Sequence, residues 1–376
     1  MKIAMIGARG IAGRYSGIET HLEELCPRLV ENGHEVVVYA RTYFTERNEY
    51  RGVKIVGLPT IRTKHLDTLA NSFLATLVSL QADVDIVHFH AQGPAIFSFL
   101  SRLGRKTTVA TIHGLDWQRD KWGKGATWCL KRAEQMSASF SNAVIVVSRT
   151  LQDYYLARYD AQRIHYVPNG VAVRTPKTPY LMRSVGLEPK GYVLFVGRLT
   201  PEKGCHHLVE AYQNVATDRK LVVVGAPAYT DAYARALRQA GNGKVVFLGP
   251  VFGDLLAELY SNAYLFVLPS LLEGLSISLL EAMSYGCCVL ASNIPQNVEA
   301  MGKCGLLFRA GDATSLRHAI REALSRPDDV QRMGDMARQY VSKEYDWDDV
   351  ATKTEQVYRH VLGKHHVSTS STLDTA

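Results

Sequence analysis

Short apolar runs alternate with longer amphipathic stretches along almost the whole chain. The runs are rich in Val, Ile and Phe, which is typical of strands buried on both faces of a sheet. Strands that alternate with helical stretches predict an α/β fold with parallel sheets. We therefore expect strands at residues 1–6, 35–40, 53–58, 86–90, 107–112, 143–148, 192–196, 220–225, 245–251, 264–268 and 287–291, and helices at 18–31, 68–82, 276–285, 312–325, 328–344 and 348–362.

Two successive series of strands and helices indicate two domains. The length of 376 residues suits two or three domains of ordinary size. We expect a first Rossmann-like domain at 1–172, a second at 173–346, and a separate helix at 347–362. The polar segment 363–376 has few apolar residues, so we expect it to be disordered.

A loop of small residues follows the first predicted strand. Gly7, Gly10 and Gly13 precede the helix at 18–31, whose N-terminal N–H groups can hold a phosphate. The same glycines suggest a dinucleotide-binding turn, but they are spaced more widely than G-x-G-x-x-G, and the second strand leads into Arg41 instead of an acidic residue. An arginine there can serve NADP, so an NADP-dependent oxidoreductase stays an alternative.

The composition is that of a globular protein, with 47% hydrophobic and 21% charged residues. The net charge of +7 suits an anionic ligand, a nucleic acid or an anionic membrane surface. Six scattered cysteines without C-x-x-C pairing suggest a reduced, cytoplasmic protein. No stretch has the length and apolar character of a membrane span, so we expect any membrane contact to be peripheral.

Two carboxylates lie around the start of the helix predicted at 276–285. Glu273 is in the loop after the strand at 264–268, and Glu281 lies eight positions later, about two helical turns away. Such a loop lies at the carboxyl edge of the sheet, where open α/β folds bind ligands. Two acids in this arrangement can reach two different hydroxyl groups of one sugar-bearing ligand.

Two basic residues follow the strand at 192–196. The sequence G-R-L-T-P-E-K-G brings Arg198 and Lys203 to one turn before a helix. A guanidinium group binds phosphate oxygens in a fork, and an ammonium group adds a mobile charge, so the pair suits a diphosphate. Both charges would stabilise a departing diphosphate.

The order of these motifs resembles the retaining GT-B glycosyltransferases of family 4. The segment 273–283, E-G-L-S-I-S-L-L-E-A-M, is similar to the family signature, and 197–204 and the turn V-P-N-G at 167–170 occur in the expected order. The resemblance implies two Rossmann-like domains that face each other across a cleft, with the helix at 347–362 returning to the first domain. It also implies that the first domain binds the acceptor and the second the nucleotide sugar, without a cofactor or a metal.

The resemblance assigns roles in the second domain. Arg198 and Lys203 would hold the diphosphate, Glu281 the ribose hydroxyls, and Glu273 the donor sugar. It implies no enzyme nucleophile, because a phosphate oxygen of the donor helps to deprotonate the acceptor in this family.

The resemblance also assigns donor contacts outside these motifs. His113, after the strand at 107–112, matches a histidine that contacts the donor sugar. Asn169 lies in the interdomain turn and is expected to face the donor. Gly17 belongs to the glycine loop, in which Ser16 stands where the family more often has glycine.

Three tryptophans are interleaved with five basic residues between positions 117 and 132. Indoles favour the headgroup level of a membrane, and cations bind anionic lipid or pyrophosphate, so an acceptor or membrane surface is expected. A helix that buries its tryptophans is an equally weighted alternative. The pattern H-G-L-D-W-x-x-x-K-W-G also resembles bacterial surface-polysaccharide enzymes, several of them rhamnosyltransferases. The expected surface residues are Trp117, Arg119, Lys121, Trp122 and Lys124.

Two further patterns suggest metal ligands, but neither predicts a metal site. His88 and His90 alternate with apolar residues and so share one face of a strand, and without a third ligand we expect them to line the site. Asp83 and Asp85 precede that strand, at the edge away from the expected ligand, and are expected to be polar end residues.

The sequence therefore predicts a retaining, metal-independent hexosyltransferase without a cofactor. It would move a hexose or deoxyhexose from a nucleotide diphosphate sugar to an acceptor hydroxyl, expected on a lipid-linked oligosaccharide of bacterial lipopolysaccharide or capsule synthesis. We expect a cytoplasmic protein, peripheral on the inner face of the membrane, that binds no nucleic acid. An NADP-dependent oxidoreductase, a nucleotide-sugar epimerase of the same fold and a non-catalytic nucleic-acid binder are the alternatives.

Overall fold

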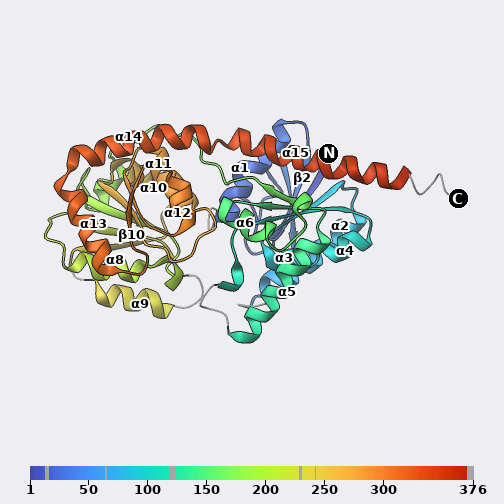
Figure 1. The fold of residues 1–376 in the computed structure, drawn as a ribbon, viewed down its shortest axis with the longest axis horizontal. Helices are drawn as coiled ribbons and strands as arrows, with labels where there is room; N and C mark the ends of the chain where they lie inside the picture. The colour runs from blue at the N-terminus through green and yellow to red at the C-terminus, as the bar shows by residue number, and fades with distance from the viewer. Residues whose placement is uncertain (13–16, 64–65, 119–122, 228–230, 242, 371–376) are drawn as a thin grey trace. The chain divides into compact units, whose positions relative to one another are not determined.

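The computed structural model describes residues 1–12, 17–63, 66–118, 123–227, 231–241 and 243–370 (Figure 1). The chain forms two compact units. Unit 1 comprises Met1–Asn169 and Trp347–Ala376, and unit 2 comprises Gly170–Asp346. Each unit contains one predominantly parallel sheet, so the predicted α/β fold class with two Rossmann-like domains is confirmed.

The sheet of unit 1 has the strand order β3-β4-β2-β1-β5-β6-β7-β8. All neighbours pair in parallel except β3 and β4. The central strands are almost wholly buried, as their continuous apolar runs predict. The strands are β1 Lys2–Ile6, β2 Glu35–Arg41, β3 Glu49–Tyr50, β4 Val53–Leu58, β5 Ile86–His90, β6 Thr107–Ile112, β7 Ala143–Val146 and β8 Ile164–Tyr166.

The sheet of unit 2 has the order β11-β10-β9-β12-β13-β14, and all its pairs are parallel. This is a doubly wound order. The chain adds strands on one side of β9 first and then continues on its other side with β12. Its strands are β9 Tyr192–Val196, β10 Lys220–Val224, β11 Val245–Gly249, β12 Leu265–Leu268, β13 Val289–Ser292 and β14 Leu306–Phe308.

Both sheets have a topological switch point, where neighbouring strands lead into connections that run in opposite directions. In unit 1 it lies between β1 and β5, and in unit 2 between β9 and β12. Ligands of open α/β sheets bind outside the carboxyl ends of the strands at such points. The residues that follow these four strands are therefore the expected ligand-binding residues of each unit.

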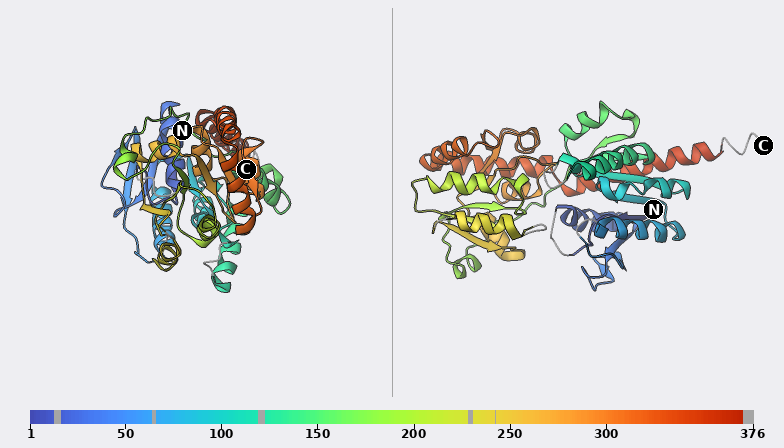
Figure 2. Two further views of the ribbon diagram at one scale, coloured as in Figure 1. Left: turned by 90° about the vertical axis from the view of Figure 1, so that its left-hand side faces the viewer. Right: turned by 90° about the horizontal axis from the view of Figure 1, so that it is seen from below.

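Helices lie on both sides of each sheet (Figures 1 and 2). Several helices begin at residues with a clear local cause. Asp312 accepts a hydrogen bond from the Ser315 N–H at 2.9 Å as an N-cap, and Pro327 occupies the first turn of α14, where its missing N–H costs nothing. In unit 1 the helices are α1 Gly17–Glu31, α2 Leu66–Gln81, α3 Gln92–Ala95, α4 Ser98–Leu103, α5 Lys124–Phe140, α6 Arg149–Leu156 and α15 Trp347–Ser370. In unit 2 they are α7 Leu181–Ser184, α8 Cys205–Gln213, α9 Asp231–Ala240, α10 Gly253–Asn262, α11 Ile277–Ser284, α12 Pro295–Met301, α13 Ala313–Ser325 and α14 Pro327–Glu344.

Helix α15 returns the chain to unit 1 and packs against α1. Arg28 of α1 donates to Asp348 at 2.6 Å, and Tyr358 is fully buried. The helix is assigned as far as Ser370, and the expectation of a disordered tail from Gly363 stays a prediction. Residues 371–376 lie outside the described residues.

The cysteines and the two aspartates before β5 lie as the sequence predicts. All six cysteines are free, and five of them are buried. Asp83 and Asp85 contact Lys2 at the amino edge of the sheet, through its Nζ at 2.6 Å and its backbone N–H at 2.7 Å, respectively. Within the described part of the chain, no helix combines the length and the apolar character needed to cross a membrane.

Candidate functional site

In unit 2, the loops after β9 and β12 are held together by close backbone contacts. Gly204 has φ of +67°, and a Cβ at this position would lie 1.9 Å from the carbonyl oxygen of Pro269. The Leu271 N–H donates to the carbonyl oxygen of Glu202 at 2.8 Å. Only glycine permits both this backbone conformation and this approach. The two motifs recognised in the sequence therefore meet at the switch point of the sheet.

Lys203 and Glu273 form an ion pair across these two loops. Lys203 Nζ lies 2.6 Å from Glu273 Oε1, and the side chains are 15% and 7% exposed. Lys203 ends a short 3-10 helix, η3 Pro201–Lys203, and Glu273 lies in the loop before α11. A charged pair this poorly hydrated costs desolvation free energy, which ordinary packing residues would avoid. Its position at a ligand-binding edge makes it the main candidate for anion and hydroxyl recognition.

Arg198 follows β9 at the same edge of the sheet. It is half-buried and lies between two backbone contacts with the β10 region: Gly197 N–H to Val224 O and Leu199 N–H to Ala226 O, both 3.0 Å. These contacts fix the main chain on both sides of the guanidinium group. The structure therefore places Arg198 on the same loop as Lys203, as the sequence predicts.

Glu281 lies on α11 and is positioned by a buried tyrosine. Tyr260 of α10 donates to Glu281 Oε2 at 3.2 Å, and its ring stacks on Tyr285 with centroids 5.7 Å apart. Burial, with a further contribution from Glu281, holds the pKa of Tyr260 well above its usual value, so the hydroxyl keeps its proton. Tyr260 thus orients the carboxylate, and no motif in the sequence marks this role.

In unit 1, His113 follows β6 and lies beside two other histidines. His90, the last residue of β5, has Nδ1 3.3 Å from Nε2 of His113. The ring of His21 on α1 lies 5.0 Å from that of His113 and 5.5 Å from that of His90, centroid to centroid. The structure therefore adds His21 to the site, through a tertiary contact that has no sequence signal.

Asn169 contacts the same histidine cluster. Its Oδ1 lies 3.0 Å from Nδ1 of His21, and both residues are buried. Burial lowers the pKa of His21 to about 4 and holds the pKa values of His90 and His113 well below the usual value. The three imidazoles are therefore neutral at physiological pH.

His88 supports the cluster without joining it. Its Nδ1 lies 2.6 Å from the Tyr358 hydroxyl, and its Nε2 lies 2.7 Å from Thr111 Oγ1. Its ring is 4.3 Å from that of His90, so the two do share one face of β5, as predicted. Both of its nitrogens are engaged, which makes His88 a packing residue beneath the site.

Trp117 is held by a buried carboxylate. Its Nε1 donates to Glu134 Oε2 at 2.7 Å, and Gln92 donates to the same oxygen at 3.1 Å. The hydroxyls of Tyr154 and Tyr159 donate to Oε1 of Glu134 at 3.0 and 2.8 Å. Trp117 lies in η1 Asp116–Gln118, directly after the loop of His113, so this network fixes the chain next to the histidines.

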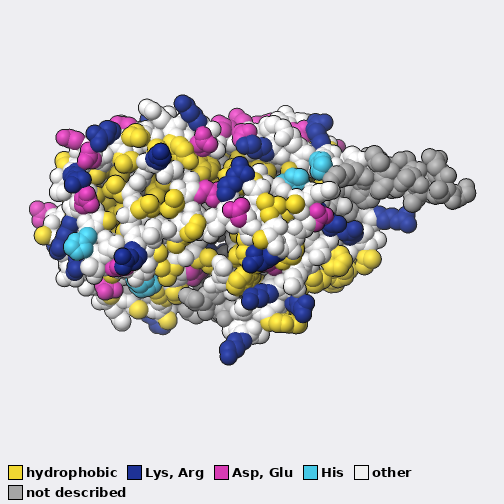
Figure 3. Space-filling view, viewed as in Figure 1, with side chains coloured by type: hydrophobic (Ala, Val, Ile, Leu, Met, Phe, Trp, Pro, Cys, Tyr) yellow, Lys and Arg dark blue, Asp and Glu magenta, His cyan; other side chains and the backbone are white. Residues whose placement is uncertain are grey.

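The basic and aromatic segment continues along α5. Trp128 is 61% exposed, with the guanidinium group of Arg132 5.4 Å from the ring centroid. The alternative that this helix buries its tryptophans is therefore wrong for Trp128. Lys124 and Lys131 are exposed on the same helix, and Figure 3 shows basic and apolar side chains side by side in this region. Arg119, Lys121 and Trp122 lie outside the described residues.

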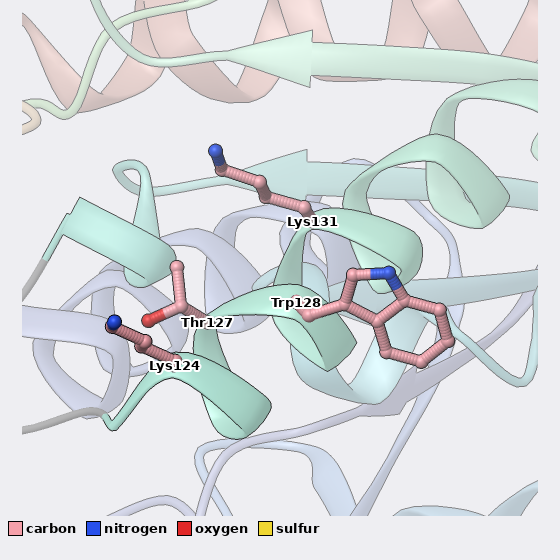
Figure 4. A pocket seen from close by; sticks show the side chains of 4 residues that line it. All are labelled: Lys124, Thr127, Trp128 and Lys131. Carbon is pink, nitrogen blue, oxygen red and sulfur yellow. The ribbon is translucent and has the colours of Figure 1, made fainter.

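A shallow surface pocket of about 300 Å³ lies on α5. Its lining combines two ammonium groups, a hydroxyl and an indole, all projecting from successive turns of one helix (Figure 4). This composition suits an anionic group next to an apolar surface. The lining residues are Lys124, Thr127, Trp128 and Lys131.

Two further residues bear on the glycine loop. Gly17 is the exposed first residue of α1, and Ser16 lies outside the described residues.

Arg41 is buried, and its Nη1 lies 2.5 Å from Asp67 Oδ2, while its Nη2 donates to Thr68 at 2.9 Å. An arginine engaged in this way does not offer a fork to the 2′-phosphate of NADP, so the oxidoreductase alternative is not favoured.

Comparisons with known proteins identify the family of the chain. Residues 15–174 match the family described as Glycosyltransferase Family 4, and residues 181–340 match Glycosyl transferases group 1. The α-maltose-1-phosphate synthase of Mycolicibacterium smegmatis is 30% identical over 340 residues, which cover 79% of this chain and 87% of that protein. The O-antigen chain mannosyltransferase B of Escherichia coli is 30% identical over 201 residues, 52% of this chain and 51% of that protein.

A solved structure shows the same fold. HepE from Anabaena, crystallised in complex with UDP-glucose, aligns with a TM-score of 0.79 at 20% identity and covers 96% of this chain and 99% of its own. The matched families cover both units, and the predicted motifs meet at the switch point of unit 2. The chain therefore belongs to the GT-B glycosyltransferases described as Glycosyltransferase Family 4 and Glycosyl transferases group 1, which transfer a sugar from a nucleotide sugar.

Proposed function

We propose that this protein is a retaining hexosyltransferase that moves a hexose or deoxyhexose from a nucleotide diphosphate sugar to an acceptor hydroxyl. The observation that carries the proposal is the buried pair of Lys203 and Glu273, which joins the two signature loops at the switch point of unit 2. A cation for phosphate and a carboxylate for sugar hydroxyls are then adjacent, as transfer from a sugar diphosphate requires.

In this proposal, unit 2 binds the donor. Arg198 and Lys203 bind the diphosphate, Glu273 binds a hydroxyl of the sugar, and Glu281, oriented by Tyr260, binds the ribose hydroxyls. The two cations neutralise the charge that grows on the diphosphate as the glycosidic bond breaks, so the transfer needs no metal or cofactor. His113, Asn169 and Gly17 of unit 1 supply further donor contacts.

The reaction proceeds on one face of the sugar. The bond between the anomeric carbon and the diphosphate oxygen breaks, and the acceptor oxygen bonds to the same face of that carbon. The proton of the acceptor hydroxyl passes to a phosphate oxygen of the departing nucleoside diphosphate. No enzyme carboxylate attacks the sugar, and Glu273 acts through binding and charge.

The proposed acceptor is a lipid-linked oligosaccharide of bacterial surface polysaccharide, reached from the cytoplasmic face of the membrane. The basic and aromatic surface of α5 supports this proposal, and a row of exposed apolar residues on α2 is a second observation in its favour. The exposed residues of α2 recur three or four positions apart, on one face of the helix. They are Leu66, Leu69, Phe73 and Leu77, which are 38–49% exposed.

A product analysis tests the proposed reaction. The protein is incubated with each nucleotide sugar and a lipid-linked or oligosaccharide acceptor, with and without a chelator, and the anomeric configuration of the product is read by NMR. The proposal predicts an α-linked product from an α-linked donor, at a rate that the chelator does not lower. An inverted product, or a reaction without an acceptor that only converts the donor sugar, contradicts it.

A further inference from the structure

The histidine cluster of unit 1 has the ligand set of a metal site. His21 comes from α1, His90 from the end of β5 and His113 from the loop after β6. One ring nitrogen from each residue lies within 4.8 Å of the other two. Zinc sites built from three histidines use this arrangement, with a fourth position left for water or substrate. The sequence predicted no metal site at His90 because no third ligand was in view, and the structure brings His21 and His113 beside it.

His21 has a buried nitrogen that the fold leaves unused. Its Nδ1 faces Oδ1 of Asn169 at 3.0 Å, and because an amide oxygen only accepts, Nδ1 carries the proton. Nε2 therefore carries a lone pair, and it is buried without a hydrogen-bond partner among the described residues. A buried acceptor without a donor is costly, and its occupation by a ligand removes that cost. Asn169 orients the ring as outer-shell partners of metal-bound histidines do.

His90 and His113 already have the spacing of two ligands on one ion. His90 Nδ1 and His113 Nε2 are 3.3 Å apart, and two nitrogens each 2.0–2.1 Å from a tetrahedral ion are separated by about 3.3 Å. Nε2 of His90 lies 3.5 Å from Met5 Sδ, a weak acceptor, which leaves Nδ1 of His90 free to present its lone pair. Nε2 of His113 donates to this lone pair in the absence of an ion. Metal binding therefore requires the proton of His113 to move from Nε2 to Nδ1.

The ligand chemistry selects the class of ion. Neutral imidazoles suit Zn²⁺, Cu²⁺, Fe²⁺ and Ni²⁺, whereas Mg²⁺ and Ca²⁺ prefer oxygen ligands. Within the described residues the group consists of the three histidines, without a carboxylate. His88 cannot complete it, because both of its nitrogens are engaged.

We propose that His21, His90 and His113 bind one divalent transition-metal ion of the zinc class. The ion is not needed for sugar transfer. Because it binds His113, which the proposed function makes a donor contact, ion and donor compete. The site is formed by unit 1 alone, and its binding can be measured without any donor.

Metal titration tests this site. The protein is stripped of metal by dialysis against a chelator and titrated with Co²⁺, whose visible absorption reports tetrahedral coordination, and Zn²⁺ is then added to displace it. The proposal predicts one tight site per chain, weakened at least tenfold in His21→Gln. The matched control is His88→Gln, a buried histidine next to the cluster, and a second control is His206→Gln/His207→Gln in unit 2; both should keep the tight site.

The outcomes separate this proposal from the proposed function. Absence of a tight site in the wild-type protein, or an unchanged site in His21→Gln, overturns the metal proposal whether or not sugar is transferred. If His21→Gln does not fold, His113→Gln serves the same comparison, because His113 is less buried. Transfer that added Zn²⁺ slows and a chelator restores, in a protein that binds Zn²⁺ tightly, is the combined result expected when both proposals hold.

Discussion

Lys203 Nζ and Glu273 Oε1 lie 2.6 Å apart, although 70 residues separate them in the chain. Because both side chains are largely buried, removal of one partner leaves the other charge without compensation. We expect Lys203→Met and Glu273→Leu each to lower the free energy of unfolding by about 3–5 kcal/mol.

The double variant Lys203→Met/Glu273→Leu separates stability from function. Replacement of a buried ion pair by apolar residues is often neutral or stabilising, so the double variant should recover most of the lost stability. It should still transfer no sugar, because it has neither the cation nor the carboxylate. Urea unfolding and a transfer assay measure the two effects, and transfer by a folded double variant would remove the pair from the site.

Tyr260→Phe tests the role of the tyrosine that orients Glu281. Loss of its hydrogen bond should lower the free energy of unfolding by about 1 kcal/mol and weaken nucleotide binding. Tyr192→Phe is the matched control, since the Tyr192 hydroxyl donates to the backbone carbonyl oxygen of Leu259 at 2.7 Å in the same unit. Calorimetric titration with the nucleotide should show a change in affinity only for Tyr260→Phe.

Gly204→Ala tests whether the backbone contact joins the two loops. The added methyl group would lie 1.9 Å from the carbonyl oxygen of Pro269, and alanine is strained at φ of +67°. Gly249→Ala introduces only the backbone strain and no steric clash, because φ there is +71° and no atom lies within 4 Å of the added carbon. We expect a loss of about 1 kcal/mol for Gly249→Ala and a larger loss for Gly204→Ala. Equal melting temperatures in thermal unfolding would contradict the close contact.

Vesicle binding tests the proposed membrane surface of α5. Each lysine near an anionic surface strengthens binding about fivefold. Lys124→Ala and Lys131→Ala should each weaken binding to vesicles with anionic lipid by that factor, and Trp128→Ala should weaken it further by removing an interfacial indole. Lys303→Ala, an exposed lysine of unit 2, is the control. Co-sedimentation in which the four variants match the wild-type protein would exclude this surface.

The alternation of strands and helices could be predicted from the sequence, because buried parallel strands are continuous apolar runs. Short edge elements were missed: β3 has two residues and β14 has three, too few for a pattern. Helix α5 was weighed only as an alternative, because its apolar residues do not form a regular stripe.

The motif residues of the site were predictable, but their partners were not. Lys203 and Glu273 each follow a strand of recognisable pattern, and the doubly wound strand order brings those strands together. His21 has no such signal, since it lies on a helix far from His90 and His113 in the sequence. The role of Tyr260 depends on the packing of α10 against α11, which no local pattern encodes.

The most direct test of the central claim is a thermal-shift panel with UDP, GDP, dTDP, ADP and NADP on the purified protein. A ligand that binds the native state raises the melting temperature. The account predicts stabilisation by at least one nucleoside diphosphate, and loss of that stabilisation in Lys203→Met/Glu273→Leu. Stabilisation by NADP alone, or a nucleoside diphosphate effect that the folded double variant retains in full, would contradict it.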